Sequence, residues 1–173
     1  MRKFYEYGGI VASIVLIAFG IGSLFMGISG RDRVRDDIAR EQIVGTPDME
    51  GIANKKIETG SDAEKFAAGI RKHTLEATGG KTYAEMPRFI GKDGKPTNDE
   101  KGAAVDPKSG EPQSNPEREV WINSTALSTA LNTAYFGESV ATFAIVMGIA
   151  LLLTGIGFLV VSLRLLREPP ART

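Results

Sequence analysis

The stretch SVATFAIVMGIALLLTGIGFLVVSL, residues 139–163, contains no charged side chain and decides the fold class. It fills the 25 positions between Glu138 and Arg164. An apolar helix needs about 20 residues to cross the hydrocarbon core of a bilayer. A surface helix of a water-soluble domain carries polar residues along one face, and this stretch has no such face. We therefore predict a transmembrane helix over residues 139–163.

A second uncharged run lies near the start of the chain, between Glu6 and Arg31. Its core reads GGIVASIVLIAFGIGSLFMGI, and we predict a transmembrane helix over residues 8–29. The alternative is a cleaved signal peptide, in which Arg2 and Lys3 form the basic region and residues 27–29 form the cleavage site. The apolar core of residues 8–26 is longer than the 7 to 15 residues that are typical of signal peptides, which favours an uncleaved anchor.

The distribution of charge predicts the orientation. Basic residues near a span favour the cytoplasmic side, and Arg164, Arg167 and Arg172 follow the second span. The first span is ambiguous, because basic residues flank it on both sides: Arg2 and Lys3 before it, and Arg31, Arg33 and Arg35 after it. The second span therefore decides the orientation. Two spans place both termini on one side of the membrane. We therefore expect a multi-pass membrane protein, with residues 1–7 and 164–173 as cytoplasmic tails and residues 30–138 outside.

The resulting fold class is mainly α: a two-helix transmembrane hairpin, extended outside the bilayer, with a small, loop-rich and mostly helical extramembrane insertion. Periodic apolar residues predict helical stalks over 31–44 and 124–138. A helix is predicted over 62–78, with Ser61 and Glu64 as a capping box and Gly79 and Gly80 as its stop. Asp93-Gly94 is a hairpin turn signal. Residues 97–119 have almost nothing to bury, which predicts a flexible linker.

The composition disfavours several classes of function. The chain has 21 basic and 21 acidic residues, so nothing in its charge indicates a nucleic-acid partner. It has no Cys and one His, too few for the common zinc and non-haem iron ligand sets. It lacks a phosphate-binding Gly-rich loop, a G-x-S-x-G motif and charged residues inside the spans. We expect no catalytic residue, no metal and no cofactor.

The single histidine, His73, has two interpretations. It lies near the end of the predicted helix 62–78, where a protonated imidazole interacts favourably with the helix dipole. In that case it is a structural residue whose neighbours are the helix end and solvent. Alternatively it is a pH sensor, which requires a partner that the sequence does not identify.

Both spans carry small residues at a spacing of seven. A seven-residue stripe keeps one helix face against a partner helix, and small side chains allow two backbones to approach closely. We predict that this stripe packs the spans against each other or against another membrane protein. Its members are Ser13, Gly20, Gly27, Ala141, Gly148, Gly155 and Ser162.

Two motifs lie in the segment between the spans: RVRDDIAREQIVGTPDM at 33–49 and HTLEATGGKTYAEM at 73–86. Over most of its length the chain resembles a family of small two-span membrane proteins from high-GC Gram-positive bacteria. The resemblance implies a membrane location and a shared loop, and it implies no established activity. Members often carry the label aromatic ring-opening dioxygenase, but one His and no Cys cannot supply the usual iron ligands within this chain.

These observations favour a non-enzymatic accessory or partner-binding subunit at the cell envelope. Its expected partners are the lipid bilayer and either a membrane protein or further copies of the same chain. The alternative is an extracytoplasmic sensor or regulator, in which the loop binds a small ligand or His73 responds to pH.

Overall fold

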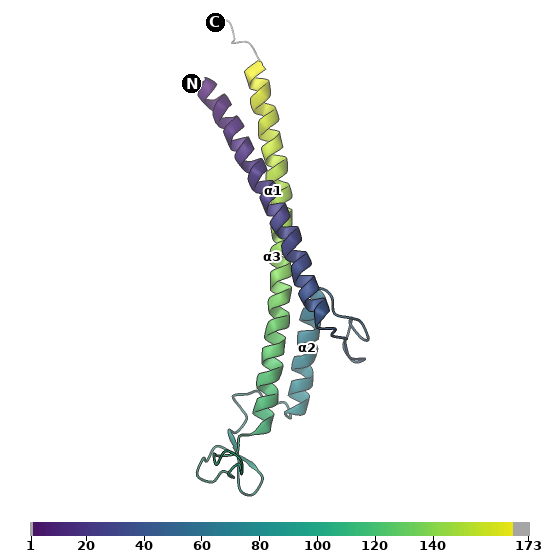
Figure 1. Cartoon of the computed structure of the whole chain (residues 1–173), viewed down its shortest axis with the longest axis vertical. Coiled ribbons are helices and arrows are strands. Elements are labelled where there is room, and N and C mark those ends of the chain that lie inside the picture. The colour runs from purple at the N-terminus through teal and green to yellow at the C-terminus, as the bar shows by residue number, and fades with distance from the viewer. Residues whose placement is uncertain (1, 168–173) are drawn as a thin grey trace. The chain divides into compact units, whose positions relative to one another are not determined.

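Two long helices dominate the computed structural model, which describes residues 2–167 (Figure 1). Helix α1 runs from Arg2 to Arg40, and α3 runs from Pro116 to Arg167 without interruption. At 1.5 Å per residue, the 52 residues of α3 extend over about 78 Å. Both helices are long and apolar enough to cross a membrane. Between them lie α2, Gly60–Ala77, and two short strands, β1, Phe89–Ile90, and β2, Pro96–Thr97.

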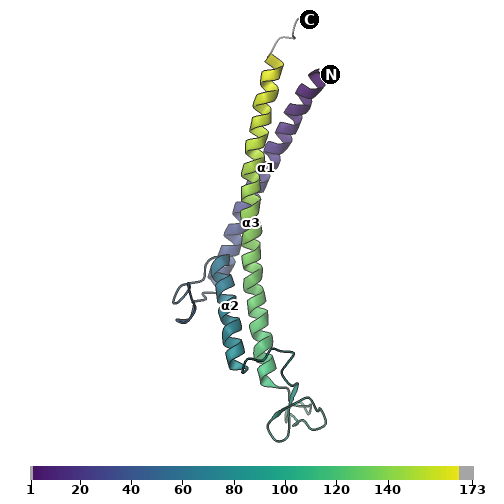
Figure 2. The same cartoon turned by 180° about the vertical axis from the view of Figure 1, so that it is seen from behind.

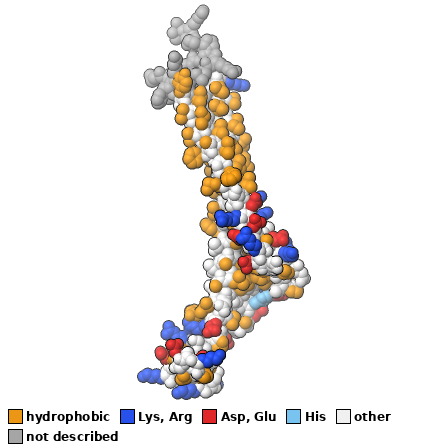
Figure 3. Space-filling view, viewed as in Figure 1, with side chains coloured by type: hydrophobic (Ala, Val, Ile, Leu, Met, Phe, Trp, Pro, Cys, Tyr) orange, Lys and Arg blue, Asp and Glu red, His pale blue; other side chains and the backbone are white. Residues whose placement is uncertain are grey.

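The chain divides into two compact units. The first contains α1 up to Asp37 and α3 from Phe136 onward. In this unit α1 and α3 lie side by side and antiparallel, as both views show (Figures 1 and 2). Large apolar side chains cover the outside of the pair, among them Phe19, Phe25 and Phe143, which are 67%, 72% and 65% exposed. Hydrophobic side chains accordingly dominate this pair in the space-filling view (Figure 3).

The second unit, Ile38–Tyr135, has a small core of its own. Ile52, Ile57 and Met86 are its largest fully buried apolar side chains. The loop between α1 and α2 folds back on itself, with a bridge between Val44 and Lys56. Gly45 is required in this loop because a side chain there would overlap the carbonyl of Ile52. Ala63 and Ala67 bury the adjoining face of α2.

The N-terminus of α2 differs from the predicted one. The helix begins at Gly60, and its cap is Thr59, whose hydroxyl accepts the backbone N–H of Asp62. The capping box of Ser61 and Glu64 was therefore wrong. Both side chains are exposed within the helix, whose first turn begins before Ser61 and carries the ion pair between Lys55 and Asp62. The helix ends as predicted, with positive φ at Gly79 and Gly80.

The prediction of a flexible linker over residues 97–119 was also wrong. Strands β1 and β2 form the hairpin that Asp93-Gly94 signalled, and Gly94 has a φ of 78°. Residues after the hairpin fold back onto it through bridges that join Gly91 to Ala103 and Phe89 to Ser114. Helix α3 then begins at Pro116, well before the predicted stalk. Hydrogen bonds rather than an apolar core hold this segment, which explains why its composition resembled that of a linker.

Candidate functional site

All seven residues of the predicted small-residue stripe are buried in the unit formed by α1 and α3. The two halves of the stripe meet in antiparallel register. Gly20 lies against Gly148, and Gly27 lies against Ala141. Gly155 lies against the side chains of Leu16 and Ile17. The stripe is therefore the surface along which α1 and α3 contact each other.

The contact at Gly20 and Gly148 is reciprocal and very close. A Cβ atom added at Gly20 would lie 2.9 Å from the carbonyl oxygen of Gly148. A Cβ atom added at Gly148 would lie 2.9 Å from the carbonyl oxygen of Gly20. Both distances are shorter than normal contacts of a Cβ atom, and the obstructing atoms are backbone. Any larger residue at either position must push the helices apart.

Two further residues at this contact were not identified from the sequence. Ser23 lies three residues after Gly20, and its hydroxyl donates to the carbonyl of Ala144 across the helix pair at 3.0 Å. Gly9 leaves space for the hydroxyl of Ser162. The i, i+3 spacing from Gly20 is a signal that could have identified Ser23. Gly9 is one of several glycines in the first span and lies outside the seven-residue repeat, so no pattern in the sequence distinguishes it.

An ion pair lies at the end of the apolar region of this unit. Arg35 donates from Nε to Oε1 of Glu138 at 2.7 Å, and this joins the charged end of the first apolar run to the residue before the second. Nearby, the Nε of Arg31 is buried without a hydrogen-bond partner in the described part of the chain. In the sequence these charges served only to mark the ends of the apolar runs.

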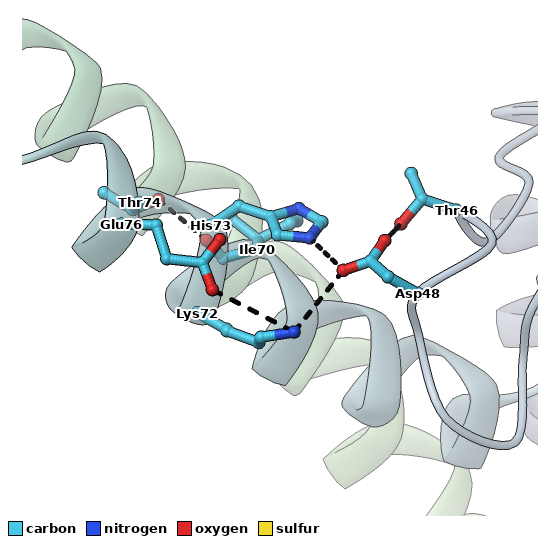
Figure 4. Close-up of polar contacts among 7 residues, drawn as sticks. All are labelled: Thr46, Asp48, Ile70, Lys72, His73, Thr74 and Glu76. Atoms are coloured by element: carbon cyan, nitrogen blue, oxygen red, sulfur yellow. Dashed lines mark hydrogen bonds and ion pairs between the residues drawn. The ribbon is translucent and has the colours of Figure 1, made fainter.

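His73 lies in a polar cluster of the second unit (Figure 4). Its Nε2 is 2.6 Å from Oδ2 of Asp48, in the loop before α2. Thr46 donates its hydroxyl to Oδ1 of Asp48 at 2.6 Å, and Lys72 Nζ lies 3.5 Å from Oδ2. The expectation that His73 has only the helix end and solvent as neighbours was therefore wrong. The histidine links α2 to a loop 25 residues away in sequence.

Packing and electrostatics both hold this loop on α2. The side chain of Met49 is buried and occupies the space next to Gly69, so a larger residue at position 69 would force Met49 to shift. The hydrogen bond from Thr46, followed by that from His73, lowers the pKa of Asp48 well below its ordinary value of 3.8. The carboxylate form of Asp48 is thus the form that the docked loop stabilises.

The cluster does not have the composition of a metal centre. Over residues 2–167, no three His, Cys, Asp or Glu side chains come together as metal ligands would. His73 and Asp48 are both substantially exposed, at 37% and 48% of their side-chain surface. The arrangement can hold or release the 46–49 loop as Asp48 loses or gains a proton.

Comparisons with known proteins yield no relative of this chain: no protein-family model, curated protein or solved structure matches it. The resemblance to small two-span proteins therefore stays a prediction. Fold and contacts alone define the class, a mainly helical protein with two helices that could span a membrane.

Proposed function

We propose that this chain is a non-enzymatic membrane protein whose α1 and α3 form a hairpin across the bacterial cytoplasmic membrane and display residues 30–138 outside to bind a partner. The observation that carries the proposal is the glycine contact between α1 and α3 inside a surface of exposed apolar side chains. Exposing that apolar surface to water would cost about 25 cal/mol of free energy per Å². Lipid tails cover it without this cost, and close backbone contact is what holds helices together in lipid.

The charge distribution supports the proposed orientation. The predicted tails carry 5 basic and 2 acidic residues, whereas residues 31–138 carry 16 basic and 19 acidic residues. Cytoplasmic segments next to spans are enriched in Lys and Arg. Both termini are accordingly proposed to lie in the cytoplasm.

The absence of cysteine from the sequence allows a direct test of the hairpin. Ser23 and Ala144 are in contact, so the double variant Ser23→Cys/Ala144→Cys should form an intramolecular disulfide when membranes are treated with an oxidant. The control is Phe25→Cys/Phe143→Cys. These residues lie at the same level of the pair, since Gly20 meets Gly148 and Gly27 meets Ala141, but both face outward. The protein should remain in the membrane after alkaline extraction. Release by alkali, or equal cross-linking of both pairs, contradicts the proposal.

A protein partner is supported by apolar residues of α3 that lie in the second unit. Val120, Ile122 and Leu127 are 45%, 51% and 45% exposed although they precede the uncharged run. Val120 and Leu127 are seven residues apart and share one face of α3, and an exposed apolar face outside a membrane commonly marks an interaction surface. A photoactivatable residue at Leu127 should give one discrete adduct in native membranes, whereas the same residue at the exposed position Thr133 should not. Identical adduct patterns at both positions contradict a specific surface.

The second candidate function is an extracytoplasmic sensor, and the contact of His73 with Asp48 favours it. A histidine that holds a loop through a carboxylate changes the strength of that contact when its ring gains or loses a proton. A loop whose hydrogen exchange changes sharply between pH 5 and 8 in the parent, and not in His73→Gln, supports the sensor. Exchange that is equal in the two proteins at every pH favours the partner-binding subunit.

A further inference from the structure

A groove runs between α2 and the first turns of α3, entirely within the second unit. Its volume is about 350 Å³, which lies within the range of small-molecule sites. Small residues of α2, Ala67 and Ala68, leave the space open on one side. The other side is a row of hydroxyl and amide side chains of α3: Ser124, Thr125, Ser128, Thr129 and Asn132.

Most of these polar groups are available to a ligand. Ser124, Ser128 and Asn132 recur every four residues, so they line one face of α3. None of the three side chains has a hydrogen-bond partner within residues 2–167. Thr129 differs, because its hydroxyl donates to the carbonyl of Thr125 within the helix. The groove thus presents a row of donors and acceptors at a regular spacing.

The end of the groove is aromatic. Trp121, the only tryptophan of the chain, is half-buried there, and the guanidinium of Arg71 lies 5.7 Å from the centre of its ring. Glu64 lines the groove as well, so the two charged side chains of the lining balance each other. A groove with no net charge gives no advantage to an anion or a cation.

We infer that this groove binds a neutral saccharide. Saccharides carry many hydroxyl groups that donate and accept, which matches the row on α3, and their C–H faces stack on flat aromatic rings such as the indole of Trp121. The charged ends of Arg71 and Glu64 form strong hydrogen bonds with hydroxyl groups without requiring charge on the ligand. The proposal depends on the second unit alone and is independent of the membrane topology proposed above.

The lone tryptophan makes the inference testable on the full chain in detergent. Maltotriose, cellotriose and tri-N-acetylchitotriose would be titrated while tryptophan emission is recorded. At least one should give a saturable change, because Trp121 is the only source of the signal. Inorganic phosphate and trialanine are tested in parallel and should give none.

Two variants on the same helix separate binding from general effects. Ser128→Ala/Asn132→Ala removes two ligand contacts and should weaken saccharide binding about tenfold. Asn123→Ala changes the same residue type at an exposed position outside the groove and should leave binding unchanged. Circular dichroism should show the parent helix content in both. A response to phosphate or trialanine only, no response to any of the saccharides, or equal affinity of the two variants overturns the inference.

Discussion

At the scale of single residues, the carboxylate of Asp48 helps to hold the loop before α2 on that helix. Its pKa is lowered by the hydrogen bonds of Thr46 and His73, so these contacts favour the folded state above the ordinary Asp pKa of 3.8. The contribution is lost as the pH falls below 3.8 toward the folded-state pKa. We expect hydrogen exchange over residues 41–58 to accelerate in that acidic range.

The variant Thr46→Val separates this effect from general acid unfolding. It removes the hydroxyl that makes the largest contribution to the lowered pKa, and it retains a side chain of similar size. The acid-induced opening of the loop should therefore begin at higher pH than in the parent. An unchanged onset contradicts the role given to Asp48.

Asp62 is a second carboxylate with a structural role, and it is buried in the first turn of α2. Burial alone raises its pKa, but the hydrogen bonds from Lys55 and Thr59 outweigh burial, and the pKa is lowered overall. We expect Asp62→Asn to destabilise the second unit by about 1 kcal/mol, because Lys55 is itself largely exposed and loses little on separation.

Thermal unfolding followed by circular dichroism would measure this change. Glu58→Gln is the control, since Glu58 is exposed in the same loop and makes no hydrogen bond or ion pair in the described residues. A loss of stability in Glu58→Gln equal to that in Asp62→Asn would contradict a specific role for the pair with Lys55.

At the scale of elements, the close contact between α1 and α3 depends on the lack of a side chain at particular glycines. Gly20→Ala/Gly148→Ala places two methyl groups against backbone atoms, so we expect a loss of about 1–3 kcal/mol from overpacking. Gly22→Ala/Gly157→Ala makes the same chemical change where nothing lies within 4 Å. This control should be neutral or slightly stabilising, because Ala favours helices over Gly.

The measurement is resistance to unfolding and to protease in lipid vesicles. Only the variant with methyl groups at Gly20 and Gly148 should separate its helices and lose protection. Equal behaviour of the two double variants would mean that the glycines at positions 20 and 148 contribute nothing beyond the Gly-rich composition of the spans.

The elements also show what the sequence can and cannot predict. Uncharged runs of more than 20 residues and a seven-residue repeat depend only on order along the chain, so the long helices and the stripe were visible. The cap of α2 was not, because Thr59 and Ser61 both suit that position by residue type, and only the structure shows that Thr59 occupies it. The partner of His73 was hidden for the same reason, since Asp48 belongs to a separate loop.

The segment after the hairpin was misread for a different reason. Two of its aspartates, Asp99 and Asp106, each accept the backbone N–H of the lysine two residues later, as Asp93 does in the hairpin turn. This local turn is a known property of Asp, and the D-x-K pattern recurs three times in the sequence. The sequence therefore contained a signal for these turns, but the pattern of apolar residues alone does not reveal it.

At the scale of the whole molecule, the proposed topology places both termini on the same side. A reporter enzyme that is active only outside the cytoplasm should be active when inserted at Gly110, an exposed turn residue with positive φ. The same reporter fused after Thr173 should be inactive. Activity at the C-terminus together with silence at Gly110 would reverse the orientation, and activity at both sites would contradict a second span.

The reciprocal glycine contact also constrains how the length of the hairpin can change. One extra residue within a span rotates all later residues of that helix by about 100° around its axis. At each later contact, a bulky side chain would then take the place of a glycine. Seven extra residues restore nearly the same face. Insertions and deletions tolerated inside α1 and α3 should therefore come in steps of seven, matched between the two helices. A version of this protein suited to a thicker membrane would be longer by whole steps of about 10 Å.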